Sequence, residues 1–127
     1  MDQILIIEPD KPLAKTYALA LKKAGHKVTV ASNSQAAINK ADKAKPRAVV
    51  LELQLVGHSG VEFLYEFRSY PDWQDVPVLI HTTVPYMELK DSWGLLSEHL
   101  GVSGYKYKPM TSLEDLVKTV NQLVSSR

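Results

Sequence analysis

Apolar and polar positions alternate regularly along this sequence, with five short strand-like runs separated by longer stretches in which apolar residues recur at helical spacing. The strand-like runs cover residues 4–7, 28–30, 48–51, 78–81 and 105–107. Unbroken apolar runs are typical of strands buried on both faces, and such strands need helices on both sides of a parallel sheet. The pattern therefore predicts an α/β fold with a doubly wound, five-stranded parallel sheet and five helices.

The first helical stretch carries its own start and stop signals. Pro12 is expected to open the helix and Gly25 to end it, because proline suits a first helical turn and glycine often follows a last one. The expected buried stripe is Leu13, Tyr17 and Leu21.

Later helices show comparable signals. Ser32 or Ser34 is expected to cap an alanine-rich second helix. Thr111 and Glu114 are expected to form a capping box at the start of the last helix. The third helix is expected to bury Val61, Leu64 and Phe67.

Polar side chains follow four of the predicted strands. They are Glu8 and Asp10 after the first strand, Glu52 after the third, Thr82 and Thr83 after the fourth, and Lys108 after the fifth. Because the carboxyl ends of parallel strands meet at one edge of the sheet, we expect these groups to lie close together.

This order of strand ends resembles the receiver domain of two-component response regulators, from residue 4 to about residue 124. The resemblance implies that Glu8 takes the first acidic position of a metal site and Glu52 the position of the phospho-accepting aspartate. It implies that Thr82 is the switch hydroxyl, Lys108 the phosphate-pairing amine and Tyr105 the aromatic switch residue. The implied fold is flavodoxin-like, with strand order 2-1-3-4-5.

Further features agree with this resemblance in part. Gly57 and Gly60 match the turn after the acceptor position, although Val56 stands where that turn usually has proline. The stretch 82–108 is longer than in the family by about four residues, which is roughly one helical turn. The extra length predicts either a longer fourth helix, within which Gly94 costs about 1 kcal/mol relative to alanine, or an elongated loop over residues 84–87.

Two departures from the family pattern decide the functional interpretation. Pro9 stands where the second metal-binding acid belongs, and it has neither a carboxylate nor a backbone N–H. Asp10 adds to the acidic pocket beside Glu8, but it is one residue further along and is expected to point elsewhere. Glu52 keeps a carboxylate yet adds a methylene, and a displacement of about 1 Å can cost about a hundredfold in a positioned reaction. We therefore expect a degenerate receiver, or pseudo-receiver, that works without phosphorylation.

Three interpretations of Glu52 stay open: a built-in mimic of the phosphorylated state, an inert filler, or a poor phosphoacceptor. The mimic predicts that Lys108 lies within ion-pair distance of Glu52 and that Tyr105 is largely buried. Weak Mg²⁺ binding through Glu8 and Glu52 is the alternative to no metal. We expect no catalytic residue, no other cofactor and no enzyme activity.

The resemblance implies protein partners: a histidine kinase, an output domain or another regulator. It also implies a homodimer or target surface on the fourth helix, fifth strand and fifth helix. The rival functions are a working phosphoacceptor that takes phosphoryl from a histidine kinase, and a flavodoxin-like domain that binds a small ligand.

Length and composition bear on the number of domains, on nucleic-acid binding and on location. A chain of 127 residues suits one domain, spanning 1–127. The net charge of +1, with basic residues dispersed among acidic ones, gives no field that attracts nucleic acid. The absence of cysteine suits a reducing compartment. No apolar run approaches the ~20 residues of a membrane span, so we expect a cytoplasmic protein.

The four histidines have no metal-ligand spacing, because they are spread over different predicted elements: His26, His58, His81 and His99. His81 lies in an apolar strand and is expected to be a core or rim histidine. Trp73 follows a Pro-Asp turn and is expected to pack against a loop.

Overall fold

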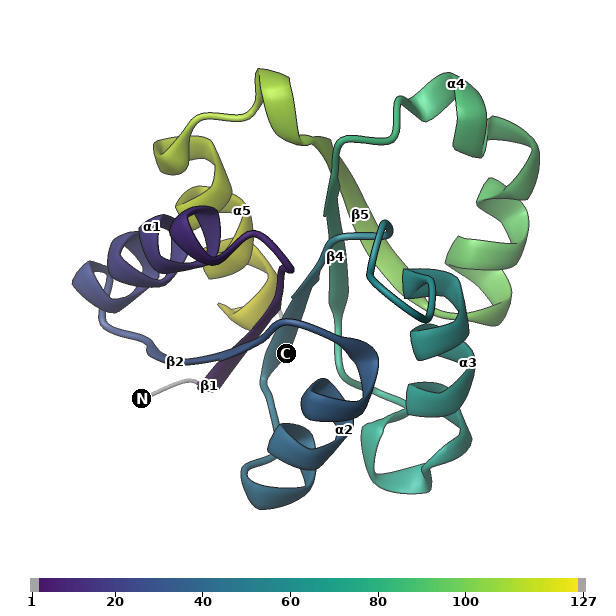
Figure 1. Ribbon diagram of the computed structural model, residues 1–127, viewed down its shortest axis with the longest axis horizontal. Helices are drawn as coiled ribbons and strands as arrows, with labels where there is room; N and C mark the ends of the chain where they lie inside the picture. The colour runs from purple at the N-terminus through teal and green to yellow at the C-terminus, as the bar shows by residue number, and fades with distance from the viewer. Residues whose placement is uncertain (1–2, 126–127) are drawn as a thin grey trace.

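The computed structural model describes residues 3–125 and contains a five-stranded parallel sheet in the order β2-β1-β3-β4-β5 (Figure 1). The strands are β1 (Gln3–Ile7), β2 (Lys27–Ala31), β3 (Ala48–Leu51), β4 (Val78–Thr82) and β5 (Val102–Tyr107). The predicted doubly wound fold and strand order are confirmed. Residues 1, 2, 126 and 127 of the predicted domain lie outside the described residues.

The central strands are apolar on both faces because both faces are covered. Every residue of β3 and β4 is buried. Successive side chains point to opposite faces, so Leu5 and Ile7 enter one core cluster while Ile4 and Ile6 enter the other. This arrangement explains why the sequence shows continuous apolar runs where a half-exposed sheet would alternate.

Helices cover each face of the sheet. Helices α1 (Lys11–Lys23) and α5 (Leu113–Ser125) pack on one face, and α2 (Ser34–Lys43) and α3 (Gly60–Ser69) pack on the other (Figure 1). Trp73 is buried and stacks on Phe67 of α3, 5.0 Å between ring centroids, which agrees with its expected packing role.

Several helix caps differ from those expected. Asn33, rather than Ser32 or Ser34, caps α2 by accepting a hydrogen bond from the Ala36 N–H at 2.9 Å. Asparagine is as effective an N-cap as serine. Which of the three neighbouring residues becomes the cap depends on where the backbone after β2 turns into the helix.

The last helix also starts one residue later than predicted. Ser112 accepts a hydrogen bond from the Asp115 N–H at 3.0 Å, whereas the Thr111 hydroxyl donates backward to the Tyr107 carbonyl. Thr111 and Glu114 therefore do not form the predicted capping box. In the first helix, the prediction that Leu13 is buried is wrong, because Leu13 is 37% exposed. Ala14 is buried in the stripe instead.

The region after β4 contains a helical segment of mixed type, here named the α4 segment (residues 86–99). It begins with α4 (Tyr86–Leu89), continues as a 3-10 turn (Lys90–Ser92) and ends as a π-helical turn (Leu95–His99). The longer-helix alternative is right, because residues 86–99 are helical throughout, but the type of helix changes along the segment. An elongated loop over residues 84–87 is wrong, because α4 starts at Tyr86.

Candidate functional site at the strand ends

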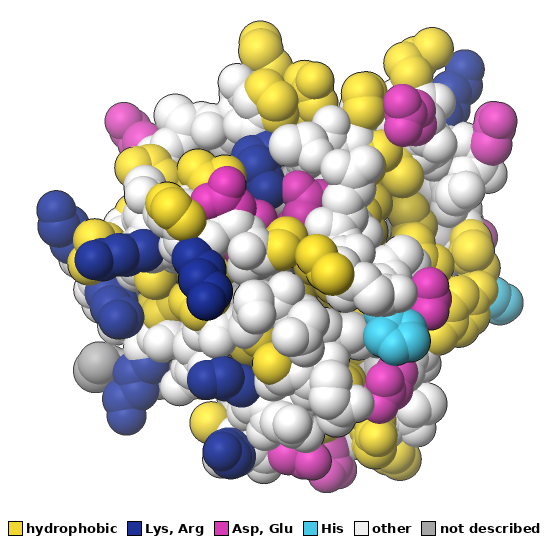
Figure 2. All heavy atoms as spheres, viewed as in Figure 1, with side chains coloured by type: hydrophobic (Ala, Val, Ile, Leu, Met, Phe, Trp, Pro, Cys, Tyr) yellow, Lys and Arg dark blue, Asp and Glu magenta, His cyan; other side chains and the backbone are white. Residues whose placement is uncertain are grey.

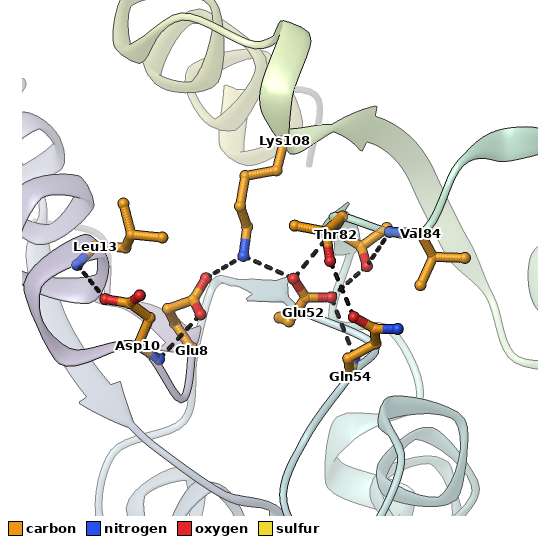
Figure 3. A network of polar contacts seen from close by, with 9 residues as sticks. Glu8, Asp10, Leu13, Glu52, Gln54, Thr82, Val84 and Lys108 are labelled. Atoms are coloured by element: carbon orange, nitrogen blue, oxygen red, sulfur yellow. Dashed lines mark hydrogen bonds and ion pairs between the residues drawn. The ribbon is translucent and has the colours of Figure 1, made fainter.

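The carboxyl ends of four strands bring Glu8, Glu52, Thr82 and Lys108 together (Figure 3), and we call this group the strand-end site. Each acid sits one residue beyond a strand and continues its hydrogen-bond ladder. The Glu8 N–H donates to the Ala31 carbonyl, and the Glu52 N–H donates to the Ile7 carbonyl, both at 3.0 Å. The sheet backbone therefore fixes where both carboxylates begin.

Lys108 bridges the two carboxylates. Its Nζ lies 2.5 Å from Glu8 Oε1 and 2.7 Å from Glu52 Oε1, and both acids are 4% exposed. Burial opposes the charge on Lys108, but hydrogen bonds from its ammonium to Glu52 and Glu8 outweigh it and raise the pKa of this amine. The three groups form a buried network with one positive and two negative charges.

The Glu52 carboxylate also binds the end of β4 and the loop after β3. The Thr82 hydroxyl donates to Oε2, the Gln54 N–H donates to Oε2 at 3.1 Å, and the Thr83 N–H donates to Oε1 at 3.2 Å. Burial opposes ionisation of this carboxyl, but the bonds from Lys108 and Thr82 dominate, so the pKa of Glu52 is lowered. Each oxygen therefore faces two donors.

The loop after Glu52 reaches this geometry through two glycines. Gly57 has φ of +87°, which residues with a side chain rarely adopt. A Cβ on Gly60 would lie 2.8 Å from the Leu53 Cα, so α3 starts closer to β3 than any other residue would allow. The loop thus holds Gln54 beside the carboxylate.

Gln54 was not identified from the sequence as a site residue. Its side-chain carbonyl accepts a hydrogen bond from the Thr83 hydroxyl at 3.0 Å, while its N–H binds Glu52. The available signal was its position two residues after Glu52, where a carboxylate commonly accepts a local backbone N–H.

Asp10 does not line the pocket with Glu8. Its Oδ1 accepts a hydrogen bond from the Leu13 N–H at 3.0 Å, so this exposed side chain caps α1. Its own N–H donates to Glu8 Oε2 at 3.2 Å. Pro9 separates the two acids, and Asp10 points away from the strand-end site, as its position one residue further along predicted.

The residues present do not fit a divalent-ion site. Within residues 3–125, no three histidine, aspartate or glutamate side chains gather in a way that could hold a metal. Mg²⁺ needs oxygen ligands with room for several waters. Here Glu8 and Glu52 already share the Lys108 ammonium, and Pro9 supplies no oxygen ligand from its side chain.

Tyr105 lies beside the site but is only partly buried. Its hydroxyl donates to the Val84 carbonyl at 2.7 Å, and its ring meets Tyr86 and Trp93 edge-on at 5.5 and 6.4 Å between centroids. Burial, followed by the neighbouring Tyr107, raises the pKa of the Tyr105 hydroxyl. Of the two geometric expectations for a mimic, the ion pair of Lys108 with Glu52 is present, and Tyr105 is buried only in part.

His81 is a core histidine next to the site. It is 2% exposed and contacts Tyr17 edge-on, 4.9 Å between ring centroids. Burial, followed by repulsion from Lys108, lowers the pKa of His81 to about 4, so its imidazole is neutral near pH 7. Its position against Tyr17 suits a packing role.

Comparisons with known proteins agree on one family. A family model described as response regulator receiver domain matches residues 4–121. Sensory transduction protein RegX3 of Mycobacterium tuberculosis is 32% identical over 114 residues, which cover 90% of this chain and 47% of RegX3. Protein PilH of Pseudomonas aeruginosa is 27% identical over 125 residues, which cover 98% of this chain and 99% of PilH.

Solved structures show the same fold. Chemotaxis protein CheY4 of Vibrio cholerae superposes with a TM-score of 0.85 at 24% identity, over 97% of this chain and 98% of CheY4. A two-component response regulator of Clostridium difficile gives a TM-score of 0.83 at 25% identity, over 98% and 97% of the two chains. The chain spans about half the length of the first curated relatives that it matches.

Proposed function

The chain belongs to the response regulator receiver domain family, and we propose that it signals through protein–protein contacts without phosphorylation of its acceptor position. The family makes it a receiver module of two-component systems. The pseudo-receiver character, the cytoplasmic location and the lack of enzyme activity are parts of the proposal.

The occupation of the Glu52 carboxylate carries this proposal. An ionised carboxylate offers about four lone-pair sites, and four donors already approach it: Lys108, Thr82 and the N–H groups of Gln54 and Thr83. A nucleophilic oxygen would have to give up at least one of these bonds in a buried place before it could attack phosphorus.

The replacement at Pro9 supports the same conclusion. Phosphoryl transfer depends on positive charge placed where negative charge develops, and a divalent ion usually supplies it. Lys108 is the cation of this site, and its charge is already shared by Glu8 and Glu52. An incoming phosphoryl group would add negative charge to a site that holds two carboxylates.

We propose that Glu52 stands in partly for the phosphorylated state. A phosphorylated residue carries nearly two negative charges and three acceptor oxygens, of which one carboxylate reproduces a part. The contacts to Lys108 and Thr82 support this role, because these two groups take the phosphate-pairing and switch positions in the family pattern.

Partner binding is assigned to the face made by the α4 segment, β5 and α5, for a target protein or a second copy. Lys90 and Lys118 are exposed and Trp93 is partly exposed there. Lys106 is paired with Asp115 at 3.1 Å, so this ion pair reduces the free positive charge that it presents.

Treatment with acetyl phosphate or beryllofluoride in the presence of Mg²⁺ tests the proposal. Intact-mass measurement after acetyl phosphate should find the wild-type chain unmodified, and fluorescence titration should find no saturable binding of beryllofluoride. Glu52→Asp alone should also stay unmodified. The double variant Glu52→Asp with Pro9→Asp should gain metal binding and a phosphorylated species. A high yield of phosphorylated wild-type chain would establish the phosphoacceptor instead, and equal phosphorylation of the single and double variants would show that Pro9 is not the lesion.

A further inference from the structure

Two neighbouring cavities lie at the edge of the sheet that β2 forms, and we call them together the β2-edge trough. The first holds about 350 Å³ between the loops after β1, β2 and β3, and it is lined by Pro9, Lys11, Ser32, Asn33, Ser34, Gln35, Val56 and His58. The second holds about 400 Å³ between α1 and β2. Lys11 and Ser32 line both cavities, so the two adjoin each other.

The lining of the trough is basic. Its lysines are Lys11, Lys15 and Lys22, and none of them forms an ion pair within residues 3–125. Among the lining residues that the structure describes, the sole carboxylate is Glu8, which already pairs with Lys108 at 2.5 Å. The uncompensated charge of the trough is therefore positive, and it selects an anion.

This basic surface reflects an uneven charge distribution, in contrast to the dispersed charges expected from composition. Nine of the fifteen lysines and arginines lie in residues 1–50, together with only four of the fourteen acidic residues. Figure 2 shows Lys and Arg side chains gathered on the side where Figure 1 places α1 and β2. His58 Nδ1 lies 3.0 Å from Glu62, so the free positive charge of the trough rests on its lysines.

A buried hydroxyl without a partner opens into the first cavity. Ser34 is 5% exposed and lies on the buried stripe of α2, whose other members are apolar. Its hydroxyl forms no hydrogen bond with any described residue. Within residues 3–125, no fully enclosed side-chain oxygen or nitrogen lacks a partner, so the Ser34 hydroxyl is reached from the cavity that this residue lines. Burying a hydroxyl is costly unless it is hydrogen-bonded, and a ligand in the cavity would supply the bond.

The start of α2 adds donors beside this hydroxyl. Asn33 caps the helix through the Ala36 N–H, and the Ala37 N–H donates to the Asn33 carbonyl at 3.1 Å. The N–H groups of Ser34 and Gln35 have no acceptor among the described residues. One hydroxyl, two N–H groups and the Lys11 ammonium are thus available to one anion, which suits the three oxygens of a phosphate better than the two of a carboxylate.

We propose that the β2-edge trough binds the diphosphate group of a small phosphorylated ligand. The first phosphate accepts hydrogen bonds from the Ser34 hydroxyl and the first N–H groups of α2, and it pairs with Lys11. The second pairs with Lys15, which lies about 6 Å further along α1, one turn of the helix. Both cavities fall within the usual size of small-molecule sites, about 300–1,000 Å³. This binding goes beyond the function proposed above and does not depend on Glu52.

Isothermal titration of the full chain with sodium pyrophosphate tests the proposal. EDTA is present throughout, so that no divalent ion carries phosphate to the strand-end carboxylates. Pyrophosphate should bind saturably and more weakly as salt rises. Inorganic phosphate should bind at least about tenfold more weakly, because it reaches Lys11 without Lys15. In a ¹⁵N-labelled chain, pyrophosphate should shift the amide signals of Ser34 and Gln35 most.

Variants locate the two phosphates. Ser34→Ala should weaken binding of both probes by about fivefold and should leave the urea midpoint no lower, because its hydroxyl has no partner to lose. Lys15→Gln should weaken pyrophosphate binding by about tenfold and leave phosphate binding unchanged. Ser103→Ala and Lys40→Gln, exposed positions outside the trough, are the matched controls and should bind as wild type does.

Several results would overturn the proposal. Sodium chloride that reproduces the effect of pyrophosphate at equal ionic strength would show only screening of the lysines. Undiminished binding in Ser34→Ala, or phosphate as tight as pyrophosphate, would remove the first or the second phosphate position. Amide shifts at Thr82 and Lys108 in place of Ser34 would assign the anion to the strand-end site. Binding to vesicles of anionic phospholipid that pyrophosphate does not compete with would assign the basic face to a membrane surface.

Discussion

The strand-end site and the α4 segment are neighbours, meeting near Thr82 and Tyr105, yet they are built in opposite ways. At the strand ends, two buried carboxylates and one ammonium are fully paired, and the backbone ladder fixes their positions. In the α4 segment, the helix changes type three times, and large apolar side chains face water, with Met87 78% exposed.

This difference indicates which part of the domain can still move. Every group at the strand ends depends on its partners, so a change there leaves a charge buried without compensation. The α4 segment is held by an aromatic cluster of Tyr86, Trp93 and Tyr105 and by few regular helical bonds. Regions with few buried contacts open at lower free energy than the core. A receiver with a fixed acceptor edge could therefore signal through this segment.

The largest effect is expected from Lys108→Met. This change leaves Glu8 and Glu52 buried without their shared cation, and removing one partner of a buried ion pair destabilises a protein by about 3–5 kcal/mol. Lys90→Met in the α4 segment, where the lysine is exposed, should stay within about 0.5 kcal/mol of wild type. Urea unfolding of both variants measures the contrast. Similar losses in the two would show that the strand-end network is not the stronger element.

Acid should weaken the strand-end side of the molecule through His81. The pKa of His81 is about 4 in the folded chain and has its ordinary value of 6.5 in the unfolded chain. Between pH 6.5 and pH 4 the unfolded chain therefore binds a proton that the folded chain does not. Stability should therefore drop by about 3 kcal/mol as pH falls from 6.5 to 4. His81→Leu should remove most of this drop, while His99→Leu, exposed in the α4 segment, should leave it in place.

A second acid effect should appear at lower pH and survive in His81→Leu. The pKa of Glu52 is lowered in the folded chain. The ionised carboxylate therefore adds to the free energy of unfolding above the ordinary carboxyl pKa of 4.5, and this stabilisation is lost as pH falls through the pKa of the folded state. Urea unfolding at a series of pH values separates the two windows. A flat profile between pH 6.5 and 4.5 in wild type would contradict the assignment to His81.

The sequence predicted the strand-end site because that prediction needs only the ends of parallel strands. Glu8, Glu52, Thr82 and Lys108 follow apolar runs, and the topology brings these positions to one edge. The sharing of Lys108 between two carboxylates depends on rotamers chosen in the packed protein, which no residue pattern encodes. The sequence indicated that Asp10 points elsewhere but not that it caps α1, although an N-cap position favours a short acidic side chain.

The α4 segment was harder to predict in detail. Its extra length was visible in the sequence, and the spacing of Leu89, Trp93, Leu96 and Leu100 indicated a helix. The structure buries Leu96 and Leu100, but the Leu100 N–H donates to the Leu95 carbonyl, five residues back. Such a π-helical turn arises when packing of the apolar side chains outweighs the regular bond pattern. The spacing of apolar residues alone does not distinguish an α-helix from a π-helical turn.

A smaller effect is expected where the two regions touch. Tyr105→Phe removes the hydroxyl that donates to the Val84 carbonyl, and this should cost about 0.5–1.5 kcal/mol. Hydrogen exchange of the Tyr105→Phe variant should be faster than in wild type in the α4 segment, with a smaller change at the strand ends. Tyr65→Phe, with a ring 52% exposed on α3, is the matched control and should be neutral. Unchanged exchange in Tyr105→Phe would mean that this bond does not hold the segment.

The smallest effect should have the opposite sign and comes from a glycine in the α4 segment. Gly94 has helical dihedral angles, φ −59° and ψ −43°, and a Cβ there would meet no heavy atom within 4 Å. Gly94→Ala should therefore stabilise the chain by about 0.5–1 kcal/mol, because alanine loses less backbone entropy in a helix. Gly60→Ala tests the other region, where the Cβ would lie 2.8 Å from the Leu53 backbone and must destabilise the turn after Glu52. Urea unfolding should thus give shifts of opposite sign for the same substitution. A destabilised Gly94→Ala would show that the α4 segment, too, is held in a tightly specified conformation, and would remove the contrast between the two regions.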